Sequence, residues 1–197
     1  MFKKLLLSLL CFLSLSNCSD ESDAQFFEYV NSELSKKQIQ LSKAILIGDS
    51  NVSCIKKTKG FKELDITVGK NKSGINTDQL ISLLNTASPD DQIEVVFIAI
   101  GTNDGYSGDS SLKLKNKLNE IYPNNKELYV IWGSRGWGGV KNKTLTDQEK
   151  FYKKFEKNGF KVIKSTLGFF KTDELAHTCG QDYHKDIIKQ MGSILNK

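Results

Sequence analysis

The sequence contains only two prolines among its 197 residues. It has no Pro-rich stretch, no internal repeat and no low-complexity tract, which excludes a proline-rich linker between domains. It also has no GxGxxG motif and no phosphate-binding loop, so a nucleotide- or flavin-binding protein is disfavoured. What remains is a chain long enough to form one domain with a substantial hydrophobic core.

A strong charge imbalance is also lacking. The chain carries 28 Lys and Arg residues against 23 Asp and Glu residues. Paired lysines at 36–37 and 56–57 have no aromatic residues between them, so they are typical of solvated faces rather than of a nucleic-acid surface. We therefore expect no nucleic-acid partner.

The amino terminus has the pattern of an export signal. Two lysines are followed by an apolar run from Leu5 to Leu15 that is short for a membrane span. LSNC at 15–18 resembles the lipobox of bacterial lipoproteins, with Asn17 as a departure, and implies lipidation of Cys18. We expect a signal peptide at 1–17 and a periplasmic or outer-surface bacterial lipoprotein, bound to the membrane only through that lipid. Cleavage a few residues later is the alternative.

The remainder divides into a tether with a helix at 18–42 and a domain at 43–197. In the domain, apolar runs typical of buried strands alternate with amphipathic stretches typical of helices. This alternation predicts a three-layer α/β/α sandwich with a five-stranded parallel sheet, and we expect the strand order 2-1-3-4-5. The strands are expected at 44–48, 63–69, 93–101, 127–133 and 160–165, and the closing helix at 184–197.

Short polar residues follow two of these strands at the point where each strand ends. GDS at 48–50 follows the first strand and GTND at 101–104 follows the third, although Gly, Asn and Asp are also common turn residues. His184 is expected at the start of the closing helix. In parallel α/β sheets ligands bind beyond the carboxyl ends of the strands. A serine, an amide and a histidine at one edge suit acyl transfer, because the hydroxyl needs a base and the oxyanion needs donors.

These motifs, in this order, resemble those of the SGNH (GDSL-like) hydrolases, a family of flavodoxin-like α/β/α sandwiches that hydrolyse esters. By this resemblance Ser50 is the nucleophile and its N–H an oxyanion donor, Asn103 is the side-chain donor, and His184 is the base. The third donor is Gly74, because a glycine shortly before a Thr and a leucine-rich helix is the family's arrangement; Gly69 is the alternative.

The last block departs from the family, which has Asp three residues before the histidine. Gln181 stands at that position and Asp182 lies one residue later. We expect Asp182 to orient His184, while Gln181 or a backbone carbonyl would serve instead. His177 is a rival base, since Glu174 precedes it by three residues.

Two cysteines remain in the domain. Their spacing matches no metal site, and no metal or cofactor is expected. If Ser50 and His184 meet as the resemblance implies, Cys54 and Cys179 are neighbours, and in an oxidising compartment we expect a disulfide between them. Two buried free thiols are the alternative.

The segment WGSRGWGG at 132–139 follows the fourth strand at the same edge. Trp132, Arg135 and Trp137 could stack on a sugar or hold an anionic group, or the segment could be a flexible loop with one tryptophan in the core. We expect a serine esterase acting on acyl esters, with acetyl esters and carbohydrate as the suggested groups. The alternative is a non-catalytic carbohydrate-binding module.

Overall fold

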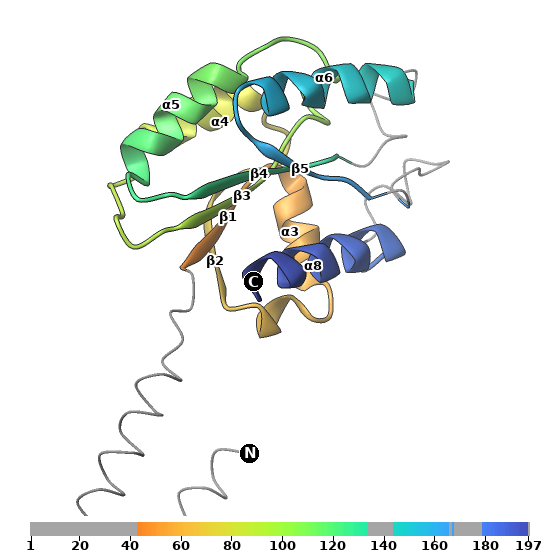
Figure 1. Cartoon of the computed structure of the whole chain (residues 1–197). Coiled ribbons are helices and arrows are strands. Elements are labelled where there is room, and N and C mark those ends of the chain that lie inside the picture. Colours follow the sequence, from red (N-terminus) through yellow and green to blue (C-terminus); the bar gives the residue numbers. More distant parts are fainter. Residues whose placement is uncertain (1–42, 134–143, 166, 168–178, 197) are drawn as a thin grey trace, which may run out of the picture. The chain divides into compact units, whose positions relative to one another are not determined.

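A computed structural model describes residues 43–133, 144–165, 167 and 179–196 (Figure 1). All of these belong to one compact unit, Leu41–Lys197. No helix in these described ranges is both long enough and apolar enough to cross a membrane.

The sheet has five parallel strands in the order β2-β1-β3-β4-β5, which confirms the predicted fold class. The central strands β1, β3 and β4 are almost wholly buried, as expected for strands covered on both faces. In the register, Gly48 pairs with Ala99 and Ala99 pairs with Ile131, so these three strands end at nearly the same level. The strands are β1 (Ala44–Gly48), β2 (Ile66–Asn71), β3 (Val95–Ala99), β4 (Glu127–Ile131) and β5 (Lys161–Ile163).

Helices cover both faces of the sheet (Figure 1). One face carries α4 (Thr77–Leu84), α5 (Ser111–Ile121) and α6 (Leu145–Lys157), and the other carries α3 (Ser50–Lys57) and α8 (Asp182–Leu195). A short 3₁₀ helix, η2 (Phe61–Glu63), connects α3 to β2.

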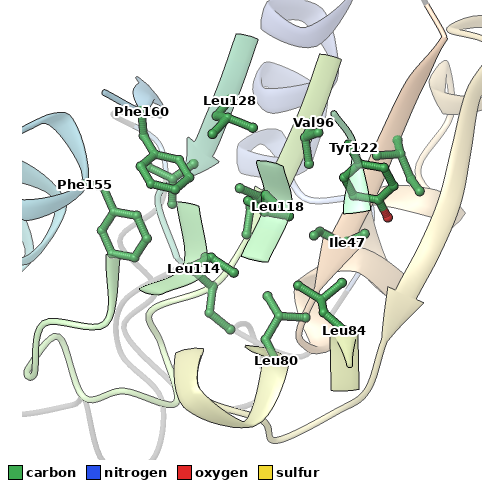
Figure 2. Packing of buried hydrophobic residues seen from close by; sticks show 14 of the residues in the cluster. Ile47, Leu80, Leu84, Val96, Leu114, Leu118, Tyr122, Leu128, Phe155 and Phe160 are labelled. Atoms are coloured by element: carbon green, nitrogen blue, oxygen red, sulfur yellow. The ribbon is translucent and has the colours of Figure 1, made fainter. Parts of the chain in front are cut away.

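Each face has its own hydrophobic cluster. In the first, Leu80 and Leu84 of α4 and Leu114 and Leu118 of α5 pack over Ile47 of β1 (Figure 2). These leucines stand at i and i+4 on their helices, which places each pair on one face. The second cluster holds α3 and α8 against the opposite side of the same strands.

Several element boundaries differ from the sequence expectation. The second strand begins at Ile66 rather than at residue 63, because Phe61–Glu63 forms a 3₁₀ turn and Asp65 has a positive φ of 50°. The third strand ends at Ala99 although Ile100 is also buried. The apolar run therefore continues beyond the last residue that pairs in the sheet. The closing helix begins at Asp182, two residues early, which puts His184 in its first turn.

Candidate active site

The site begins where strand β1 meets strand β3. Gly48 has a φ of +139°, and a Cβ at this position would lie 2.0 Å from the carbonyl oxygen of Ala99. The backbone N–H of Asp49 donates to that same oxygen at 2.9 Å. Only glycine tolerates this approach and this φ, so the GDS motif presses the start of α3 against the end of β3.

Asp49 is the N-cap of α3 and is completely buried. One carboxylate oxygen accepts hydrogen bonds from the backbone N–H and the side-chain amide of Asn51, both at 2.9 Å. The other accepts from the side-chain amide of Asn103 at 3.3 Å. Burial raises the pKa of Asp49 to about 7, and the negative charge of Asp104 adds to this, while the hydrogen bonds from Asn51 and Asn103 lower it.

Ser50 is the first residue of α3 and is half-buried. Its hydroxyl makes no hydrogen bond to any residue that the structure describes. Its backbone N–H belongs to the first helical turn, where donors lack an intrahelical partner and where the helix dipole favours negative charge.

The GTND segment, 101–104, forms a tight turn in the connection from β3 to α5. The N–H of Tyr106 donates to the carbonyl of Gly101, which has a φ of +119°. Asp104 accepts from the backbone N–H of Thr77 at 3.0 Å and so anchors the turn to the first turn of α4. Burial raises the pKa of Asp104. The turn therefore fixes Asn103 from both sides.

The two candidate oxyanion glycines occupy different settings. Gly69 lies within β2, where a Cβ would come within 2.6 Å of the Ile45 side chain, so its role is close packing in the sheet. Gly74 lies in the exposed connection from β2 to α4, with a φ of +77° and open space around it. The connection leaves the carboxyl end of β2, which is the edge where Ser50 lies.

His184 is buried on α8 and packs edge-on against Tyr183, with 5.0 Å between ring centroids. Neither ring nitrogen has a hydrogen-bond partner among the described residues, so no bond joins it to Ser50 there. Burial lowers its pKa to about 4, which keeps the imidazole neutral.

Neither expected partner makes a hydrogen bond to the His184 ring. The Asp182 side chain is 79% exposed and pairs with Lys185 at 2.9 Å. Gln181 is the N-cap of α8 without a capping hydrogen bond from its side chain. The rival pair, Glu174 and His177, lies outside the described residues.

The predicted disulfide between Cys54 and Cys179 is confirmed, with 4.6 Å between the two Cα atoms. Cys54 stands one turn after Ser50 on α3, and Cys179 stands three residues before α8 begins. The bond therefore ties the segment that leads into α8 to the helix that carries Ser50.

Trp132 is buried and stacks on Tyr152 of α6, with 5.5 Å between ring centroids. The ammonium group of Lys164 lies 4.2 Å from the Trp132 ring centroid. The ring borders a surface cavity of about 380 Å³ between α6 and β5. This geometry favours the interpretation of Trp132 as a core residue. Arg135, Trp137 and the lipidation candidate Cys18 lie outside the described residues.

Sequence reasoning missed a buried polar network beneath this edge, formed by Tyr106, Gln148 and Tyr152. The helical pattern of α6 does not assign a hydrogen-bond partner to the Tyr152 hydroxyl, because the partners lie on other elements. Asp49 was visible only as part of a motif, because its burial depends on β3. Within the described ranges no cluster of three His, Cys, Asp or Glu side chains could hold a metal ion.

No protein-family profile matches the chain, and no curated protein matches its sequence. Solved structures do match its fold. A catalytic mutant of an acetylxylan esterase from Geobacillus stearothermophilus has 14% identity and a TM-score of 0.52, over 79% of this chain and 94% of that one. A member of the lipolytic G-D-S-L family from Veillonella parvula has 15% identity and a TM-score of 0.50, over 79% of this chain and 98% of that one.

A GDSL-like lipase from Bacteroides thetaiotaomicron has 13% identity and a TM-score of 0.53, over 88% of this chain and 98% of that one. At such low identities these similarities establish a shared fold. Any shared chemistry has to be argued from the residues of this chain.

Proposed function

We propose that the protein is an exported serine ester hydrolase of the SGNH type, with Ser50 as its nucleophile. One observation carries the proposal: the hydrogen bond between Asp49 and Asn103, which joins the GDS and GTND motifs. The bond joins the ends of two neighbouring strands, and this supports a common site for Ser50 and Asn103. The likeness of the fold to that of esterases and lipases supports the same assignment.

In the proposed reaction the Ser50 hydroxyl attacks the acyl carbon of the ester, and a histidine takes the hydroxyl proton. The Ser50 N–H, the Asn103 side-chain amide and the Gly74 N–H bind the oxyanion. The histidine then protonates the leaving alcohol. Water, activated by the same histidine, hydrolyses the acyl-enzyme and restores Ser50.

The base is one of the two histidines of the chain, and we favour His177. His184 is buried without a bond to Ser50, and its expected partner Asp182 faces solvent. His177 has Glu174 at the family spacing and lies two residues before Cys179, which is bonded to α3.

We propose a small acyl group, with acetyl esters of carbohydrate as the substrate class. An acetylxylan esterase is among the proteins that share the fold. Arg135 and Trp137 are the proposed contacts to the alcohol part of the substrate. A signal peptide at 1–17 and a lipid at Cys18 would place the enzyme at the bacterial envelope, where such esters occur.

Hydrolysis of p-nitrophenyl acetate by the full chain tests the proposal. We expect Ser50→Ala to abolish turnover and labelling by a fluorophosphonate, with Ser53→Ala as the matched control on the same helix. Turnover that survives in Ser50→Ala would exclude this nucleophile.

The same assay distinguishes the two histidines as candidate bases. We expect His177→Ala to lose turnover by at least the 10³-fold typical of a missing general base, about as much as Ser50→Ala. We expect His184→Phe to keep it wherever the variant remains folded by circular dichroism. The reverse pattern would assign the base to His184 and would require α8 to move.

A carbohydrate-binding module on the same fold is the second candidate. It is favoured by the absence of a bond between Ser50 and any described histidine. Calorimetric titration with xylo-oligosaccharides tests this candidate. Binding in the titration, together with no turnover on any short ester, would support the binding module and overturn the proposal of an enzyme.

A further inference from the structure

The hydrogen-bonded ladder between strands β3 and β4 ends at the pair Ala99 and Ile131. After Ile131 the chain remains bonded to β5, since the N–H of Trp132 donates to the carbonyl of Ile163 at 3.0 Å and continues the β4–β5 ladder. The chain after β3 continues through Ile100 into the turn that carries Asn103. The next backbone groups on the two chains, at Ile100 and Gly133, are buried and no longer pair with each other.

The hydroxyl of Tyr152 bridges these two groups. It donates to the carbonyl oxygen of Ile100 at 2.7 Å and accepts from the backbone N–H of Gly133 at 2.6 Å. Tyr152 comes from α6, and its side chain is almost completely buried. A Cβ on Gly101 would lie 2.6 Å from the same hydroxyl, so the turn toward Asn103 packs directly on it.

A second set of hydrogen bonds joins the segment after β3 to the segment after β4, at the carbonyl group of Gly133. The carbonyl oxygen of Gly133 accepts from the side-chain amide of Gln148 at 2.6 Å and from the hydroxyl of Tyr106 at 3.2 Å. Tyr106 lies three residues after Asn103, at the other end of its turn. Both sides of the Asn103 turn are therefore tied, through α6, to Gly133.

Burial raises the pKa of Tyr152 well above its ordinary value, the neighbouring Tyr106 adds to the effect, and the hydrogen bond from Gly133 opposes it. The hydroxyl therefore keeps its proton and remains a donor to Ile100 across the physiological range.

We propose that Tyr152 is a positioning residue for the oxyanion site. Its hydroxyl fixes the distance between the segment that leads from β3 to Asn103 and the segment that follows β4. This inference rests on the proposed function. Loss of the hydroxyl leaves two buried backbone groups without partners, and the turn would have to shift to recover them. A misplacement of ~1 Å can cost about 10²-fold in rate.

The test is a double-mutant cycle between Tyr152→Phe and Asn103→Ala, read as kcat and KM for p-nitrophenyl acetate. We expect Tyr152→Phe to lower kcat by about 10- to 100-fold with little change in KM, because the oxyanion donor acts in the transition state. In the Asn103→Ala background we expect the same change to have almost no effect. A purely structural role would lower activity equally in both backgrounds.

Tyr129→Phe is the matched control. Tyr129 is also a buried tyrosine, but its hydroxyl bonds Glu127 at the amino end of β4, away from the site. We expect it to leave kcat unchanged. If Tyr152→Phe does not fold, Gln148→Met takes its place in the double-mutant cycle, because this change removes a donor to the carbonyl of Gly133.

Equal losses with and without Asn103, or an unchanged kcat in Tyr152→Phe, would overturn the inference while leaving Ser50-dependent turnover intact. A wild-type chain without Ser50-dependent turnover would overturn the proposed function, and the inference with it.

Discussion

The side-chain amide of Asn103 donates a hydrogen bond of 3.3 Å to Asp49, a residue 54 positions earlier in the chain. The bond crosses the carboxyl ends of two adjacent parallel strands, β1 and β3. An amide nitrogen carries two hydrogens, so one remains for another acceptor. Asp49 thus fixes the orientation of the proposed oxyanion donor and caps the helix of the proposed nucleophile at the same time.

The first prediction concerns Asn103. If its amide binds the oxyanion, Asn103→Ala should lower kcat by about 10²- to 10³-fold with a small change in KM. Steady-state hydrolysis of p-nitrophenyl acetate measures this. Asn71→Ala is the control, because the Asn71 side chain is exposed and bonds only the carbonyl of Gly69 among the described residues. An Asn103→Ala enzyme with wild-type kcat would remove Asn103 from the site.

A second prediction follows from two buried groups whose pKa values shift in opposite directions. Folding raises the pKa of Asp49 to about 7, so between pH 4 and 7 the native state binds the extra proton and stability falls as pH rises. Folding lowers the pKa of His184 to about 4, so between pH 4 and 6.5 the unfolded state binds the extra proton and stability rises with pH.

In the wild type the two effects offset each other over this range. Relative to wild type, Asp49→Asn should therefore gain stability as pH rises from 4 to 6.5, and His184→Phe should lose it, each by up to ~1.4 kcal/mol per pH unit. Urea unfolding at a series of pH values measures both slopes. Parallel pH profiles for the wild type and both variants would contradict the burial of these groups.

The third prediction concerns the disulfide. Cys54 and Cys179 are 125 residues apart, and closing so long a loop stabilises by about 4–5 kcal/mol in the entropy model, with typical measured losses of about 2–5 kcal/mol. We expect the Cys54→Ser, Cys179→Ser double variant to lose that much in urea unfolding. Reductant should destabilise the wild type but leave the double variant unchanged, and equal sensitivity of the two would count against the bond.

A fourth prediction compares two glycines with positive φ. Gly48→Ala should prevent folding or cost well over ~2 kcal/mol, because the new Cβ meets the backbone of Ala99 in addition to the unfavourable φ. Gly74→Ala meets no atom within 4 Å, so only the backbone cost of about 1–2 kcal/mol applies. Thermal unfolding of both variants checks the order, and similar losses would contradict the close approach of β1 to β3.

The sequence by itself determined the architecture and the edge at which the site lies. Continuous apolar runs can be buried only as central strands, the strands alternate with amphipathic helices, and parallel strands bring all their carboxyl ends to one side. That was enough to place Ser50 and Asn103 at the same edge, and the resemblance then paired Cys54 with Cys179. The architecture and the common edge follow from local pattern and from the handedness of the connections.

Only the tertiary structure decided the state of the groups at that edge. The burial of Asp49 depends on strand β3, the neutral His184 on the packing of α8, and the bridge of Tyr152 on where α6 crosses the ends of β3 and β4. Protonation, exposure and hydrogen-bond partners are set by residues about 50 positions away in the chain. A local sequence pattern does not encode them, because desolvation and pairing arise only when the layers pack together.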